Sequence, residues 1–209
     1  MTVAEVREKI LTDDTFVLAE LERVQYLYRL QRIIRSNLKR EENIKTESVA
    51  EHIYGMNVLA HYFSAVEDLP HPLDMAKVFA MITWHDIDEI ETGDIVGFHK
   101  TAADRQREET AIETVIASTS VVLTTPIESV LAEYKTQATL EAQFVKAIDK
   151  IDPIFYFLNE NGYQVFKTSP ATKEQHCRIK EPYLKDFPCM MRFHTVTLEK
   201  FEEREFFKK

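Results

Sequence analysis

The amino-acid sequence predicts an almost purely α-helical protein. Only four Gly and seven Pro occur among its 209 residues, so few positions oppose a helix. The hydrophobic residues, 44% of the chain, recur mostly at the i, i+3, i+4 spacing that places them on one helical face. This length is ample for a single core, and no linker, repeat or low-complexity segment divides it. We therefore expect one domain over residues 1–209.

Composition excludes several classes of partner. The net charge of −9 argues against a nucleic-acid polymer, because a phosphate backbone is bound by a basic surface. The two cysteines, Cys177 and Cys189, are too few for a disulfide framework and indicate a reducing compartment. No apolar leader follows Met1, and no apolar run approaches the ~20 residues of a membrane span. We expect a cytoplasmic protein with no membrane partner.

The N-terminal part of the chain is predicted to form three helices. A short helix over residues 3–12 is followed by a second from Thr15 to about Lys39, capped by Asp13 or Asp14. The apolar face of the second helix consists of Val17, Leu21, Val24 and Tyr28. Its basic end contains Arg29, Arg32, Arg35, Lys39 and Arg40, and the helix dipole alone accounts for such cations. A capping box of Ser48 and Glu51 then begins a helix that ends near Phe63.

The remaining helices follow from apolar spacing and from Pro and Gly positions. The Pro residues in 69–73 indicate a loop, and a helix over residues 75–84 buries the run 78–82. Further helices are expected over 100–118, from about Pro126 onward, and over 138–158. Two more helices, split near Phe187–Pro188, should fill 171–209. The aromatic tail residues Phe201, Phe206 and Phe207 are expected to be exposed unless they contact another subunit.

The segment from Trp84 to Asp94 concentrates polar chemistry at the end of a buried helix. Five carboxylates and one imidazole occur within the ten residues 85–94. His85 beside Asp86 suits a divalent metal with mixed nitrogen and oxygen ligands. Glu89 shares a helical face with His85 if the helix continues, and could act as a base beside the metal. An acidic, solvated helix end is the alternative explanation of the same residues.

Two further polar residues fall on apolar helical faces. His52 lies in the first turn of its helix, where a hydrogen-bonded core histidine is the ordinary alternative to a metal ligand. Asp149 interrupts the core-facing side of the 138–158 helix, and an ionised carboxylate there is costly unless it is paired or bound to a metal. Asp152 and Glu141 are competing acids in the same segment. Asp152 precedes Pro153, so it could instead mark a kink.

In this order and context the residues resemble the HD-domain metal-dependent phosphohydrolases, in particular the branch that contains bacterial 5′-deoxyribonucleotidases. The matching segments are Glu47–His52, the string His85-Asp86-x-x-Glu89-x-x-Thr92-Gly93-Asp94, and Lys146–Lys150. The resemblance covers roughly residues 24–160 and leaves the C-terminal helices of 170–209 without a functional assignment. It implies a helical bundle of the HD-domain type.

The resemblance also implies the roles of individual residues. The metal ligands would be His52, His85, Asp86 and Asp149, binding one divalent ion, with Mn, Co, Mg, Fe and Zn all compatible. Glu89 and Asp94 would lie near the attacking water and the leaving group, and Arg35 and Lys100 would contact the phosphate. The deoxynucleotidases have a Trp after that Arg, whereas this chain has Ser36. The resemblance therefore does not extend to deoxyribose selectivity.

The implied activity is hydrolysis of nucleoside 5′-monophosphates to nucleoside and phosphate. Two other HD activities stay open, removal of triphosphate from nucleotides and cleavage of phosphodiesters. A metal- or nucleotide-binding regulator without turnover is the alternative from a different class, although Glu89 and Asp94 would have no use in one. Because relatives are commonly dimers and the tail is rich in Phe, we expect a homodimer.

Overall fold

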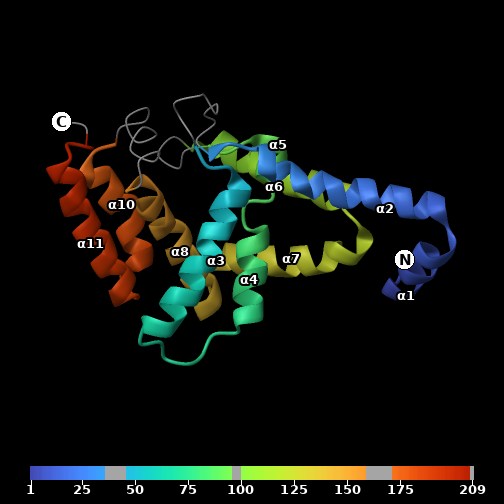
Figure 1. Cartoon of the computed structure of the whole chain (residues 1–209), viewed down its shortest axis with the longest axis horizontal. Coiled ribbons are helices and arrows are strands. Elements are labelled where there is room, and N and C mark those ends of the chain that lie inside the picture. Colours follow the sequence, from blue (N-terminus) through green and yellow to red (C-terminus); the bar gives the residue numbers. More distant parts are fainter. Residues whose placement is uncertain (36–45, 96–99, 159–170, 208–209) are drawn as a thin grey trace.

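The computed structural model describes residues 1–35, 46–95, 100–158 and 171–207, and they form a largely helical body with an N-terminal arm (Figure 1). Within these ranges, extended pairing is confined to one antiparallel bridge between Ile34 and Ser48. The predicted all-α class is confirmed. None of the described helices combines the length and apolar content required to cross a membrane.

The N-terminal arm consists of α1 (Val3–Thr12) and α2 (Asp14–Leu27), followed by the 3₁₀ helix η1 (Tyr28–Arg32). Asp13 caps α2 by accepting a hydrogen bond from the Phe16 amide. The expectation of one helix reaching about Lys39 is wrong. After η1 the chain turns extended and pairs with the segment before α3, with Arg35 N donating to Glu47 O at 3.0 Å. This pairing overrides local helical preference, and residues 36–45 lie outside the described part of the chain.

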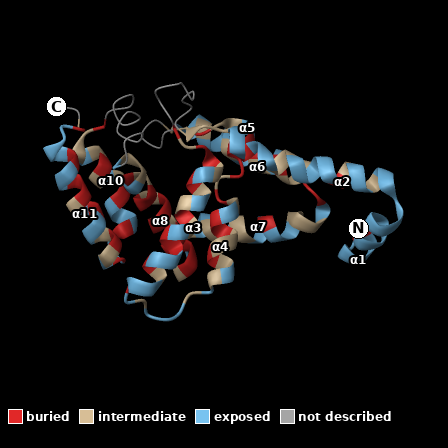
Figure 2. Ribbon diagram, viewed as in Figure 1, coloured by how far each residue is buried: buried red, intermediate tan, exposed pale blue. Residues whose placement is uncertain are grey.

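The predicted apolar face of α2 does not pack into the core. Val17, Leu21, Val24 and Tyr28 are between 38% and 60% exposed. The arm extends away from the body and is coloured mostly as exposed in Figure 2. The helical periodicity of these residues is therefore real, but nothing in the described chain covers the face that they form.

The core is built around three helices, α3 (Val49–Val66), α4 (Met75–Trp84) and α8 (Leu140–Phe157). The capping box of Ser48 and Glu51 is present at the start of α3, as predicted. The largest buried side chains on these helices include Met56, Phe63, Met81, Ile82, Phe144, Ile148 and Ile151. Since α3, α4 and α8 all contact one another, their ends can bring distant residues of the sequence together.

Three helices lie beside this core, α5 (Glu89–Thr92), α6 (Ala102–Ser118) and α7 (Val121–Thr136). The structure differs from the prediction at α7, which begins at Val121 rather than near Pro126. Pro126 is therefore an interior residue, and the helix accommodates one missing backbone donor. Ile127, the residue after Pro126, is fully buried.

The C-terminal helices α10 (Lys173–Leu184) and α11 (Pro188–Glu203) are split at the predicted position. Glu67, at the end of α3, accepts hydrogen bonds from the amides of Cys189 and Met190 in the first turn of α11. The expectation of exposed tail aromatics is wrong. Phe201 and Phe206 are buried and stack with ring centroids 5.1 Å apart, so the tail packs against its own chain.

Candidate metal centre

His52 and His85 approach each other at the meeting point of α3 and the end of α4. The two ring centroids lie 5.6 Å apart. His52 is placed by the capped first turn of α3, and His85 follows α4 directly, with its amide bonded to Met81 O at 2.9 Å. His85 Nδ1 lies 2.9 Å from the carbonyl oxygen of Ile82. If Nδ1 carries the proton, this bond leaves Nε2 as a lone-pair donor to a metal.

Both Nε2 atoms face carboxylates. His52 Nε2 lies 3.8 Å from Asp149 Oδ1 and 3.9 Å from Asp86 Oδ2, and His85 Nε2 lies 3.0 Å from Asp86 Oδ2. Both nitrogens are buried; His52 Nε2 has no hydrogen-bond partner among the described residues, and His85 Nε2 lies against the Asp86 carboxylate. One ligand atom from each of His52, His85 and Asp86 falls within 4.8 Å of the others. Buried imidazole nitrogens beside carboxylates fit the donor set that a divalent metal requires.

Asp149 is held from its other side by two lysines of α8. Lys146 Nζ and Lys150 Nζ donate to Asp149 Oδ2 at 3.0 and 2.9 Å. Burial alone would raise the pKa of Asp149, but the charges of Lys150 and Lys146 hold it well below its usual range. Burial likewise opposes ionisation of Asp86, and the adjacent His85 lowers the pKa of that carboxyl. Both carboxylates are therefore ionised and available as oxygen ligands.

Asp152, which the sequence leaves open as a competing acid or the mark of a kink, contacts His52. Its Oδ2 lies 2.7 Å from His52 Nδ1, deep in the core. The two nitrogens of His52 thus face different acids one turn apart on α8, Asp149 at Nε2 and Asp152 at Nδ1. A carboxylate on the second ring nitrogen fixes the tautomer of a metal-binding histidine. The sequence offered one signal for this pairing, the spacing of three between Asp149 and Asp152.

Glu89 is the first residue of the short helix α5 and lies near Asp86 and Asp94. α4 ends at Trp84, and Glu89 N bonds to Asp86 O at 3.1 Å, so the chain turns rather than continuing α4. Gly93 ends α5 with a φ of 69°, which glycine adopts without strain. Glu89 is buried, and its Oε2 has no hydrogen-bond partner among the described residues. Burial has the largest effect on the pKa of Glu89 and, with the negative charges of Asp86 and Asp94, raises it well above its ordinary value.

Arg35 reaches the same cluster from the extended segment after η1. One guanidinium nitrogen of Arg35 lies 3.6 Å from both Asp86 Oδ2 and Asp94 Oδ1. Its Nε lies 3.6 Å from Glu47 Oε1. Burial of its carboxyl, together with the negative charge of Asp152, raises the pKa of Glu47 to about 8. Glu47 is thus a further half-buried acid near the cluster, to which the sequence assigns no role.

Lys100 lies at the edge of the cluster, just before α6. Its Nζ lies 2.6 Å from Glu108 Oε1, and its charge also lowers the pKa of Asp88. Burial of Asp88 and the negative charge of Asp86 outweigh this effect and raise the pKa of Asp88 to about 7. The structure thus brings together all eight residues named from the sequence, with Lys100 the most peripheral. Ser36 lies outside the described residues.

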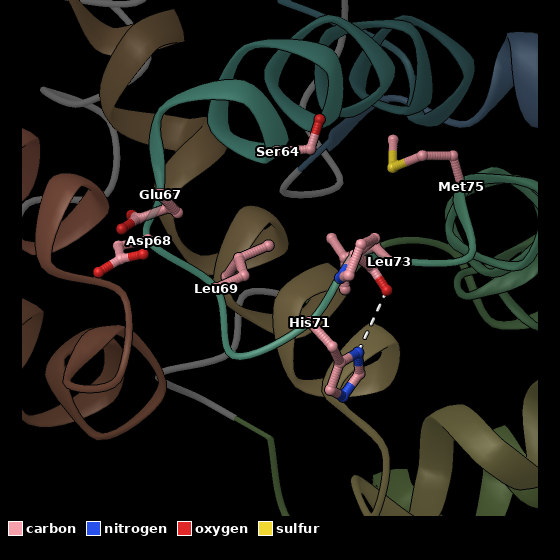
Figure 3. A pocket seen from close by; sticks show the side chains of 8 residues that line it. Ser64, Glu67, Asp68, Leu69, His71, Leu73 and Met75 are labelled. Atoms are coloured by element: carbon pink, nitrogen blue, oxygen red, sulfur yellow. Dashed lines mark hydrogen bonds between the residues drawn. The ribbon is translucent and has the colours of Figure 1, made fainter.

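A separate hollow lies far from this cluster, at the loop between α3 and α4. It encloses about 440 Å³ and is lined by Ser64, Glu67, Asp68, Leu69, His71, Pro72, Leu73 and Met75 (Figure 3). His71 Nδ1 lies 3.1 Å from the carbonyl oxygen of Pro72. Ser64 is twelve residues beyond His52 on α3, about 18 Å along the helix axis at 1.5 Å per residue. The hollow therefore takes no part in the metal centre.

Two curated relatives resemble most of the chain. The protein is 30% identical over 159 residues to the 5'-deoxynucleotidase HDDC2 of Xenopus laevis, covering 72% of this chain and 77% of the relative. It is 28% identical over 144 residues to the 5'-deoxynucleotidase HDDC2 of Bos taurus, covering 68% and 66%.

Solved structures and a family model extend the comparison. A predicted metal-dependent phosphohydrolase from Magnetospirillum magnetotacticum MS-1 superimposes with a TM-score of 0.75 at 21% identity, covering 92% of this chain and 96% of that one. A conserved hypothetical protein from Pyrococcus furiosus gives a TM-score of 0.57 at 21% identity, covering 86% and 97%. These likenesses concern the fold. A family model described as HD domain matches residues 27–190, which reach beyond the motif-bearing segment, through α10 and into the first turn of α11. The chain belongs to the HD-domain family.

Proposed function

We propose that the protein is a divalent-metal-dependent phosphohydrolase that converts nucleoside 5′-monophosphates to nucleoside and phosphate. The observation that carries this proposal is the pair of buried Nε2 atoms of His52 and His85, which face Asp149 and Asp86; that of His52 has no hydrogen-bond partner among the described residues. The relatives named as deoxynucleotidases support the substrate class.

The proposed ligands of the metal are His52, His85, Asp86 and Asp149. A bound divalent ion would activate water and polarise a phosphoryl oxygen. Asp152 orients the ring of His52 through Nδ1, and Ile82 O does the same for His85. Lys146 and Lys150 keep Asp149 ionised from the side away from His52.

The remaining named residues act on substrate and water in this proposal. Arg35 and Lys100 place positive charge where the phosphoryl oxygens gather negative charge during transfer. Glu89 accepts the proton of the attacking water, and its raised pKa makes the carboxylate a stronger proton acceptor than an ordinary Glu. Asp94 pairs with Arg35 at 3.6 Å, and its negative charge helps to raise the pKa of Glu89.

A phosphate-release assay tests the proposal. Nucleoside monophosphates, nucleoside triphosphates and a phosphodiester are each incubated with the metal-free protein and with Mn²⁺, Co²⁺, Mg²⁺, Fe²⁺ or Zn²⁺. We expect metal-dependent release of orthophosphate and nucleoside from monophosphates. Release of triphosphate, or cleavage of the diester alone, would assign another HD activity. Metal binding without any turnover would indicate a regulator.

We further propose that the protein is a homodimer in the cytoplasm. Two exposed apolar faces support an association between copies, the α2 face defined above and a second on α3 formed by Tyr54, Val58, Tyr62 and Val66. The unpaired thiols of Cys177 and Cys189 suit a reducing compartment. Light scattering at micromolar concentration should give twice the chain mass of 24.4 kDa. A single species at the chain mass would contradict the dimer.

A further inference from the structure

One buried amine from the C-terminal helices reaches the site helix α8. Lys180, on α10, is only 4% exposed, and its Nζ donates to the backbone carbonyl oxygen of Lys150 at 2.6 Å. α10 packs directly against α8 (Figure 1). Burial, together with the positive charge of Lys150, lowers the pKa of Lys180 to about 7. Burial of an amine costs free energy. We therefore looked for what the hydrogen bond from Lys180 to Lys150 O contributes to α8.

The reason lies in a missing backbone hydrogen bond within α8, which runs unbroken from Leu140 to Phe157. Pro153 stands inside the helix and has no amide hydrogen, so the carbonyl of Asp149 loses its usual donor four residues later. The proline ring also crowds that carbonyl and loosens the turn from Asp149 to Pro153. Lys180 supplies a donor to this turn, at the carbonyl directly after Asp149.

The turn that ends at Pro153 carries both acids that face His52. Asp149 Oδ1 lies 3.8 Å from His52 Nε2, and Asp152 Oδ2 lies 2.7 Å from His52 Nδ1. A change in the pitch of this turn would move the two carboxylates relative to the imidazole. The charges of both acids act on Lys180, which places its amine close to them.

We propose that Lys180 is a positioning residue of the metal centre, which holds the turn of α8 that ends at Pro153 and thereby positions Asp149 and Asp152 around His52. The inference rests on the proposed metal site. It gives the C-terminal helices a role in that site, which the sequence motifs of residues 24–160 do not supply.

The test compares Lys180→Met with Lys173→Met, a matched control on the same helix whose Nζ pairs with Glu202 near the surface at 2.7 Å. Mn²⁺ is titrated into each metal-free protein by calorimetry. We expect Lys180→Met to weaken Mn²⁺ binding about 10- to 100-fold, as is usual for residues that orient metal ligands. Lys173→Met should bind Mn²⁺ as the wild type does. Binding by Lys180→Met within about twofold of wild type would overturn the inference.

Hydrogen exchange of the metal-free proteins separates this inference from the proposed function. Amides of 149–157 should exchange faster in Lys180→Met than in Lys173→Met, whether or not the wild type binds Mn²⁺. Unchanged exchange there would overturn the positioning role, whereas a wild type without Mn²⁺ binding would overturn only the metal site. If Lys180→Met does not fold, Lys180→Gln replaces it. The glutamine side chain is too short to reach Lys150 O, so weaker Mn²⁺ binding and faster exchange of amides 149–157 are again expected. Wild-type values of either quantity in Lys180→Gln would overturn the inference.

Discussion

At the scale of single residues, the two nitrogens of His52 explain why the site needs two acids from one helix. Nδ1 bonds to Asp152 and Nε2 points towards Asp149 and Asp86. A lone core histidine would instead place both nitrogens on ordinary hydrogen-bond partners. The interpretation of His52 as merely a satisfied core residue therefore does not fit its surroundings.

Substitution of Glu89 tests whether this residue accepts a proton or contributes only negative charge. Glu89→Gln keeps the shape of the side chain but cannot accept a proton. If Glu89 takes the proton of the attacking water, kcat should fall by about 10²–10⁴-fold while bound Mn²⁺ is retained. Steady-state kinetics and elemental analysis measure the two quantities.

The matched control for Glu89→Gln is Glu113→Gln, on the exposed side of α6. Its kcat should equal that of the wild type. Asp88, the immediate neighbour, would be a poor control because it is buried and its pKa is raised to about 7. A fully active Glu89→Gln that retains its metal would contradict the proton-acceptor role.

The sequence could identify ligand candidates but not their supporting residues. His85, Asp86, Glu89 and Asp94 are close in the chain, so their spacing alone gathers them. Asp152 bonds to a residue one hundred positions away, and Lys180 bonds to one thirty positions away. Such contacts depend on how helices pack, and no local pattern reports them.

At the scale of elements, capping and periodicity predicted most helices well. Ser48 begins α3 and Trp84 ends α4 as expected, because caps and apolar stripes are local signals. α2 was predicted too long because residues 33–35 exchange helical bonds for pairing with residues 47–49. The predicted start of α7 is too late, because proline favours the first turn of a helix, whereas Pro126 lies in the interior of α7.

Gly55 couples the packing of α3 to the site on α8. A Cβ added at Gly55 would lie 2.8 Å from Asp152 Oδ1, so Asp152 must shift in Gly55→Ala. Alanine normally stabilises a helix interior by about 1 kcal/mol relative to glycine. We nevertheless expect Mn²⁺ binding to weaken about 10- to 100-fold, because the bond between Asp152 and His52 is disturbed. Calorimetric titration of the metal-free variant measures this loss.

A double substitution tests the origin of the Gly55→Ala effect. If the loss passes through Asp152, then Gly55→Ala should weaken Mn²⁺ binding no further in an Asp152→Ala background. Additive losses in the two variants would mean that Gly55→Ala disturbs the site by another route.

At the scale of the whole molecule, buried histidines between α10 and α11 predict an acid-sensitive fold. Burial, with the charge of Lys180 adding, lowers the pKa of His176 to about 3 and that of His194 to about 4. His194 also faces Glu181, and His176 packs beside Phe201 and Phe207. Below an unfolded-state pKa of about 6.5, the unfolded chain binds more protons than the folded one. The free energy of unfolding should therefore fall as the pH drops from about 6.5 towards 4.

Urea denaturation of the metal-free protein between pH 8 and 4.5 measures this dependence. His194→Gln should have a shallower loss of stability with falling pH than the wild type, whatever its stability at pH 8. His61→Gln, at an exposed histidine of α3, should retain the wild-type slope. Equal slopes for His194→Gln and the wild type would exclude His194 as a source of the acid sensitivity.

The most direct test of the metal centre is the stoichiometry of Mn²⁺ binding, measured by calorimetry on metal-free wild type, His85→Ala and the control His61→Ala. We expect one Mn²⁺ per chain in the wild type and in His61→Ala. His85→Ala should lose most of this binding while it retains a cooperative thermal transition, because one of four ligands is removed. Unchanged binding in a folded His85→Ala, or no binding in the wild type, would contradict a metal centre at His52, His85, Asp86 and Asp149.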